Sequence, residues 1–72
     1  MERMPVKSSQ IKSIGYDREK KVLEVEFNSG SVYHYAGVEP EVHASLMASE
    51  SIGKHFHANI RNSFPFHKLE AK

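Results

Sequence analysis

Residues 22–27 (VLEVEF) alternate between apolar and acidic side chains, and this pattern constrains the fold more than any other stretch. A period of two is that of a β-strand with one buried face, which here carries Leu23, Val25 and Phe27. The chain contains no cysteine, so disulfides cannot stabilise it and neither can a Cys-ligated metal. The sequence therefore predicts a small domain built on an amphipathic sheet.

A short loop, residues 28–30 (NSG), follows this strand and sets its pairing with the next one. Three-residue hairpin loops often place Gly in the left-handed conformation, which only Gly adopts without steric cost. With this loop Tyr33 lies opposite Val25 and Tyr35 lies opposite Leu23, so both tyrosines share the apolar face. A two-residue Ser-Gly loop would shift the register by one and place them on the polar face. We predict the three-residue loop.

The remaining periodic stretches predict one more strand and two helices. Pro40 suits the first turn of a helix, where its missing N–H does no harm, and Ser51 suits the N-cap of a second helix. Gly15, inside the first strand, is interpreted as a mark of a bulge or a close backbone approach. The predicted elements are strands at residues 9–16, 22–27 and 31–35 and helices at residues 40–48 and 52–62.

The first predicted strand alternates imperfectly. Ile14 and Tyr16 share one face, whereas Ile11 falls on the other. The strand is nevertheless the best interpretation of this segment, because turn residues bound it and no helical period is present.

The order of these elements predicts an α+β fold, in which a three-stranded antiparallel meander is followed by two C-terminal helices packed on one face (β-β-β-α-α). We expect a single domain at residues 6–67, with flexible ends at residues 1–5 and 68–72. No apolar run approaches the ~18 residues of a membrane span, and the N-terminus lacks the apolar stretch of a signal peptide. We therefore expect a cytoplasmic protein that does not contact membranes.

Charge is unevenly distributed, although the net charge is only +1. Residues 39–50 hold three acids and no Lys or Arg, and residues 51–69 hold no acid. At about 100° per residue, Lys54, His57 and Arg61 share one face of the second helix, opposite its apolar stripe. Such a face can neutralise the phosphates of a nucleic acid, and it is equally typical of the solvated outside of an amphipathic helix.

Two further features bear on nucleic-acid binding. The turn after the first strand holds Arg18, Lys20 and Lys21, which would extend a basic footprint if the fold placed them beside the second helix. Tyr33 and Tyr35 are typical either of core packing beneath helices or of base stacking on a sheet. The predicted register favours the core, and both uses stay open.

No motif predicts catalysis or metal binding. His55 and His57 lie about 200° apart on a helix, so they cannot share one ion there. The sequence has no Cys nucleophile and no GxSxG elbow. Glu24 and Glu26 resemble a carboxylate pair, but they are more typical of a solvated strand face. We therefore predict no catalytic residue, no metal and no cofactor.

Several short motifs follow one another with a characteristic order and spacing. They are Ser8-Ser9-x-Ile11, Ile14-Gly15-Tyr16-Asp17, Leu23-x-Val25-x-Phe27, Gly30-x-x-Tyr33-x-Tyr35, Val38-x-Pro40, Leu46, Ser51-x-Gly53, Phe56 and Ile60. Together they resemble the KTSC domain, which is named for the C-terminus of some lysyl-tRNA synthetases. The resemblance covers residues 6–64 and implies a free-standing bacterial or phage form.

The resemblance implies little about function, because the role of the family is unestablished and RNA binding is suggested only by the synthetase association. The sequence also departs from the family pattern at two places. His55-Phe56 stands where an aromatic pair is common, and Phe64 stands where the family often ends on Tyr, so the resemblance implies no aromatic role there.

Two functional hypotheses follow. The first is a small non-enzymatic binding module for RNA of tRNA-like class that uses the basic helix face. The alternative is a protein–protein interaction module, indicated by an acidic helix beside a basic one. Phe64 and Phe66 also favour the alternative, because they exceed what a short tail needs and could either cover the core or form an adhesive edge.

Overall fold

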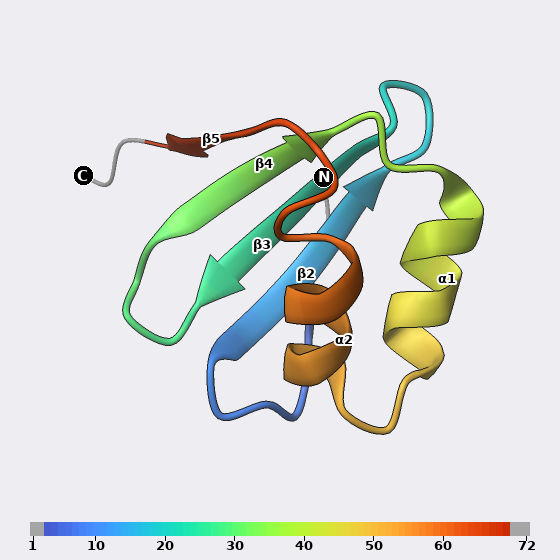
Figure 1. Ribbon diagram of the computed structural model, residues 1–72. Helices are drawn as coiled ribbons and strands as arrows, with labels where there is room; N and C mark the ends of the chain where they lie inside the picture. The colour runs from blue at the N-terminus through green and yellow to red at the C-terminus, as the bar shows by residue number, and fades with distance from the viewer. Residues whose placement is uncertain (1–2, 70–72) are drawn as a thin grey trace.

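The computed structural model describes residues 3–69, which form a five-stranded antiparallel sheet with two helices on one face (Figure 1). The elements are β1 (Arg3–Pro5), β2 (Ile11–Asp17), β3 (Val22–Phe27), β4 (Val32–Ala36), α1 (Pro40–Ala48), α2 (Ile52–Asn59) and β5 (Phe66–Leu69). The strands lie in the order β1-β2-β3-β4-β5. The α+β class is therefore confirmed, with the predicted meander at the centre as β2-β3-β4.

The predicted count of three strands is wrong, because a short strand adds to each edge of the meander. β1 pairs with β2 through Met4 and Ile14, and β5 pairs with β4 through Phe66 and Tyr35. These edge strands have three and four residues, too few to show a periodic pattern, and β5 pairs with a strand that lies far away in the sequence. Because β5 follows α2, the helices are not the last elements of the fold.

These edge strands also carry the sheet past the predicted domain limits, into residues 3–5 and 68–69. Residues 1–2 and 70–72 of the predicted flexible ends lie outside the described residues. Flexibility of the ends stays a prediction.

The hairpin of β3 and β4 has the predicted register. Leu23 lies opposite Tyr35, and Val25 lies opposite Tyr33. The N–H of Phe27 donates to the carbonyl of Ser31 at 2.9 Å, which closes a three-residue loop. Gly30 in that loop has a φ of 98°, as the left-handed position requires. The register therefore places both tyrosines on the face covered by the helices.

Ile11 reaches the core because β2 contains a bulge. Ile11 lies opposite Phe27 and Ser13 lies opposite Glu26, so two steps along β2 match one step along β3. Ile11 is fully buried rather than turned to the other face as its spacing indicates. The bulge lies between Ile11 and Ser13 and not at Gly15. Gly15 lies instead beneath the side chain of Arg3 on the polar face of the sheet.

The core lies between the sheet and the helices, and Phe56 of α2 is its largest fully buried side chain. The rings of Phe27 and Tyr35 meet Phe56 edge to face, at centroid distances of 5.7 and 5.2 Å. The other buried apolar side chains are Ile11, Ile14, Leu23, Val25, Val38, Leu46 and Ile60. Phe64 packs against this core as a partly buried side chain, so it covers the core rather than forming an adhesive edge.

α1 has the predicted bounds, whereas α2 ends at Asn59, earlier than predicted. The N–H groups of Ile60 and Arg61 both donate to the carbonyl of Phe56 at 2.9 Å, which closes the last turn before the chain leaves the helix. Ser51 precedes α2, but its side chain makes no capping hydrogen bond. In Figure 1, α2 lies in front of β2 and the segment after it crosses β3, while β4 and β5 extend beyond the helices.

Candidate functional site

The polar side of α2 carries the predicted basic residues. Lys54 and Arg61 are exposed and His57 is half-buried, with Arg61 just past the helix end. Nη1 of Arg61 lies 3.3 Å from Nδ1 of His57, and Nε2 of His57 contacts Oε1 of Gln10. Because a guanidinium only donates, Nδ1 accepts and Nε2 carries the proton donated to Gln10. This chain of contacts joins α2 to the segment before β2.

A cleft of about 510 Å³ opens beside α2 on the helix side of the sheet. It extends from the loop between β3 and β4 to Phe66 of β5, where the helices leave the sheet uncovered. The lining residues that matter most for chemistry are Gln10, Tyr33, Tyr35, His57, Arg61 and Phe66. The volume lies within the roughly 300–1,000 Å³ typical of small-ligand sites. We name it the aromatic cleft.

Aromatic rings form one wall of the aromatic cleft. The ring of Phe66 lies 5.7 Å from that of Tyr33 and 5.3 Å from that of Tyr35. Tyr35 is buried, Tyr33 is half-buried, and Phe66 is 54% exposed. The wall thus has a buried base and an accessible rim, so Tyr33 and Tyr35 serve the core while Tyr33 also borders the cleft.

The electrostatic character of the aromatic cleft is cationic. No Asp or Glu is among the described residues that line it, whereas Arg61 is and supplies the positive charge. Burial raises the pKa of the Tyr35 hydroxyl above its usual value, and the charge of Arg61 acts in the opposite direction. Arg61 and Tyr35 both line the cleft. The cleft therefore favours a ligand that is both aromatic and anionic.

The structure brings four of the predicted site residues together: Tyr33, Tyr35, His57 and Arg61 all line the aromatic cleft. Lys54 lines a neighbouring hollow that shares His57 with the cleft. That second hollow runs along α2 and the segment before β2.

The predicted basic turn lies elsewhere. Arg18, Lys20 and Lys21 follow β2, at the opposite end of β3 from the loop that borders the cleft. A strand of this length spans roughly 20 Å. Nζ of Lys21 is also 3.2 Å from Oε1 of Glu39 and so is already paired. The structure therefore does not bring these three residues together with the basic face of α2.

Sequence reasoning missed Gln10 and the placement of Phe66 in the site. Gln10 carries no motif, and only its contact with His57 reveals it. Phe66 enters the cleft because Ala36 donates a 2.9 Å hydrogen bond to the carbonyl of Pro65, which brings β5 alongside β4. Residues 66–69 (FHKL) show no alternation of apolar and polar side chains, so no periodic signal predicts this strand.

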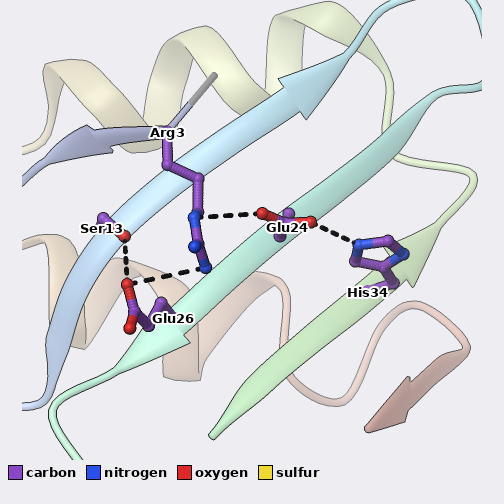
Figure 2. A network of polar contacts seen from close by, with 5 residues as sticks. All are labelled: Arg3, Ser13, Glu24, Glu26 and His34. Atoms are coloured by element: carbon purple, nitrogen blue, oxygen red, sulfur yellow. Dashed lines mark hydrogen bonds and ion pairs between the residues drawn. The ribbon is translucent and has the colours of Figure 1, made fainter. Parts of the chain in front are cut away.

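The opposite face of the sheet carries a network of polar contacts, shown in Figure 2. Glu24 accepts from Nε of Arg3 at 3.2 Å and pairs with Nε2 of His34 at 2.7 Å. Glu26 accepts from the hydroxyl of Ser13 at 2.9 Å and lies 3.6 Å from Nη1 of Arg3. These carboxylates are only 15% and 21% exposed, so they are less solvated than predicted and act as partners for other side chains.

Gly15 has a clear position in this network. It lies between Arg3 and Glu24 in the cross-strand row, and it has no side chain to separate them. The long side chain of Arg3 can therefore cross β2 and reach both glutamates on β3. The contact crossing Gly15 is made by a side chain, so neither the predicted bulge nor the predicted close backbone approach is observed at this residue.

The described residues 3–69 form neither a metal-binding group nor a membrane-spanning helix. Within residues 3–69, no three His, Asp or Glu side chains gather into a group that could hold a metal ion. In the same part of the chain, neither helix has the length and apolar character needed to cross a membrane.

The fold and the site together define a small α+β domain with an aromatic, cationic cleft beside its second helix. The chain belongs to the KTSC domain family, whose model matches residues 7–64. The resemblance read from the sequence is therefore confirmed.

Similar proteins include short chains and parts of longer ones. An uncharacterized protein of Stutzerimonas stutzeri is 48% identical over 56 residues, which cover 78% of this chain and 79% of the relative. A lysine–tRNA ligase of Nostoc punctiforme is 41% identical over 61 residues, which cover 85% of this chain but only 11% of the ligase. The crystal structure of a KTSC domain protein from Yersinia pestis superposes with a TM-score of 0.93 at 38% identity, covering 96% of this chain and 97% of that one. The domain thus occurs both as a short protein and within a ligase.

Proposed function

We propose that this chain is a small, non-enzymatic RNA-binding module. The observation that carries the proposal is that Lys54, His57 and Arg61 follow one side of α2 and lead into an aromatic cleft with no lining carboxylate among the described residues. Basic side chains neutralise phosphates, and aromatic side chains stack on unpaired bases, so this combination suits a single-stranded or looped RNA.

The relatives add support of a different kind. Three of them are named lysine–tRNA ligase, and the matched region makes up 11% of each. A domain that accompanies a tRNA ligase works in the presence of RNA. The proposal therefore agrees with the setting in which these relatives carry the domain.

The polar network on the opposite face supports a non-enzymatic role. Glu24 and Glu26 are engaged by Arg3, His34 and Ser13, as Figure 2 shows, so neither is placed as a free acid–base pair. Their contacts tie together β1, β2, β3 and β4. We assign this network to the stability of the sheet.

The test is fluorescence anisotropy of labelled single-stranded RNA and of tRNA at low salt. We expect the double variant Lys54→Glu/Arg61→Glu to lose most of its affinity. The matched control, Arg18→Glu/Lys20→Glu, makes the same charge change at the opposite end of β3 and should bind as the wild type does. Removal of two phosphate contacts should also reduce the slope of log affinity against log salt by about 1.4.

Three outcomes would contradict the proposal: no binding to any RNA, an equal loss in both double variants, or no loss in the α2 variant. The alternative of a protein-interaction module is favoured by one observation, the exposed ring of Phe66 on an edge strand. Light scattering tests it directly, because a dimer that dissociates on Phe66→Ala would replace RNA binding as the function of this surface.

A further inference from the structure

We propose that the aromatic cleft takes a single unstacked nucleobase, which stacks on Phe66 while Arg61 pairs with a neighbouring phosphate. This inference rests on the proposed RNA binding and adds the part of the ligand that is recognised. In this inference the cleft binds the base, and Lys54, further along α2, binds the continuing backbone.

The exposure of Phe66 is the first argument for a base. Phe66 and Met4 are the two large apolar side chains of residues 3–69 that are strongly exposed, at 54% and 62%. Met4 lies on β1 at one edge of the sheet, whereas Phe66 lies on β5 at the other edge and lines the cleft. Stacking on a flat partner removes the face of such an exposed apolar ring from water, which stabilises the complex.

The arrangement of the rings behind Phe66 is the second argument. The rings of Tyr33 and Tyr35 are nearly aligned, with an interplanar angle of 30°, and Tyr35 is inclined to Phe66 by 33°. Phe27 and Phe56 brace them from below in edge-to-face contacts. The core therefore holds the two tyrosines, and Phe66 lies against their rings at centroid distances of 5.7 and 5.3 Å, so the site is largely formed before a base binds.

Charge is the third argument, and it separates a nucleotide from a neutral aromatic ligand. Arg61 is exposed at the cleft, its contact with His57 holds it beside the opening, and no carboxylate among the described lining residues competes for it. Gln10 is held by His57 at the same rim and presents a side-chain amide for the edge of a base. The cleft thus offers a ring face, an amide and a cation within one opening.

The experiment compares two probes of equal length, an adenine hexaribonucleotide and a ribose–phosphate hexamer without bases, in competition for labelled RNA. We expect the base-free chain to compete at least about tenfold more weakly, because base stacking is lost. Phe66→Ala should weaken hexaribonucleotide binding by about tenfold, whereas Phe66→Trp, which keeps a ring face, should preserve it. Met4→Ala is the matched control at the other sheet edge and should have no effect.

The outcomes separate this inference from the proposed function. Equal competition by the base-free chain, or unchanged binding by Phe66→Ala, overturns the base site while RNA binding through Lys54 and Arg61 survives. Loss of binding in Phe66→Ala but not in Lys54→Glu/Arg61→Glu supports base stacking on Phe66 but refutes both the basic face and the pairing of Arg61 with a phosphate. Absence of RNA binding in the wild type overturns both. Thermal unfolding of each variant shows that the compared proteins are folded.

Discussion

Replacing Phe56 by Ala should test the core more severely than any other single change. Phe56 is fully buried and its ring meets Phe27 and Tyr35 edge to face. Removal of such a ring costs about 3–5 kcal/mol, because the transfer energy is lost and a cavity is left. A domain of 72 residues has a free energy of unfolding of about 4–11 kcal/mol, so this is a large share of the total.

Thermal unfolding followed by circular dichroism measures the effect. A loss of 3 kcal/mol or more should lower the Tm by at least about 12 °C in a domain of this size. Phe66→Ala is the matched control, because it removes the same ring from a site that is 54% exposed, and we expect it to cost about 1 kcal/mol or less.

If Phe56→Ala proves too unstable to purify, Val25→Ala keeps the prediction measurable. Val25 is also fully buried, and its truncation should cost about 2 kcal/mol. A fall of only a degree or two for either core variant, or an equal fall for the Phe66 control, would refute the assignment of the core.

Three further changes have defined outcomes. Burial lowers the pKa of His43, whose ring stacks on Tyr16 at 4.6 Å, so protonation favours the unfolded chain. The free energy of unfolding should therefore have its full value above about pH 6.5 and should fall as the pH drops below that value. Urea unfolding at two pH values should show a smaller fall for His43→Gln than for the wild type. Gly30→Ala should lower the free energy of unfolding by about 1–2 kcal/mol, because φ is 98° and a side chain strains this conformation. No atom contacts the added methyl, so the cost comes from the backbone alone, and an unchanged urea midpoint would contradict this. Gly53→Ala improves helix propensity but places a methyl 3.0 Å from the hydroxyl of Ser8. It should therefore raise the free energy of unfolding more in a Ser8→Ala background than in the wild type. If the changes in free energy of the two single variants simply add in the double variant, the clash is refuted.

The central hairpin was predictable because local chemistry determines it. The alternation of β3 and the positive φ of Gly30 together specify one register, and that register places Tyr33 and Tyr35 where the structure has them. The first helix was predictable for a similar reason, since Pro40 and a regular apolar spacing mark its start and its course.

The edge strands and the bulge were not predictable, because their causes are not local. β1 and β5 are too short to show a pattern, and each is defined by its pairing with a neighbouring strand, which for β5 lies far away in the sequence. Ile11 appears on the wrong face until the shifted pairing of β2 with β3 is known. A single-sequence pattern contains neither piece of information.

In the candidate site too, the residue types were predictable from the sequence, whereas their convergence was not. Tyr33, His57 and Arg61 could each be selected from the sequence by residue type and spacing. Their convergence on one cleft depends on where α2 ends and on the return of the chain to form β5, which adds Phe66. The separation of the basic turn at Arg18 from this site likewise follows from the strand order alone.

The claim that RNA binds at the aromatic cleft is tested most directly by a two-dimensional NMR titration of the labelled wild-type protein with the adenine hexaribonucleotide. We predict that the shifted resonances gather at Tyr33, His57, Arg61 and Phe66, which line the cleft. Shifts gathered around His34 on the opposite face of the sheet, or an unchanged spectrum at saturating RNA, would contradict it.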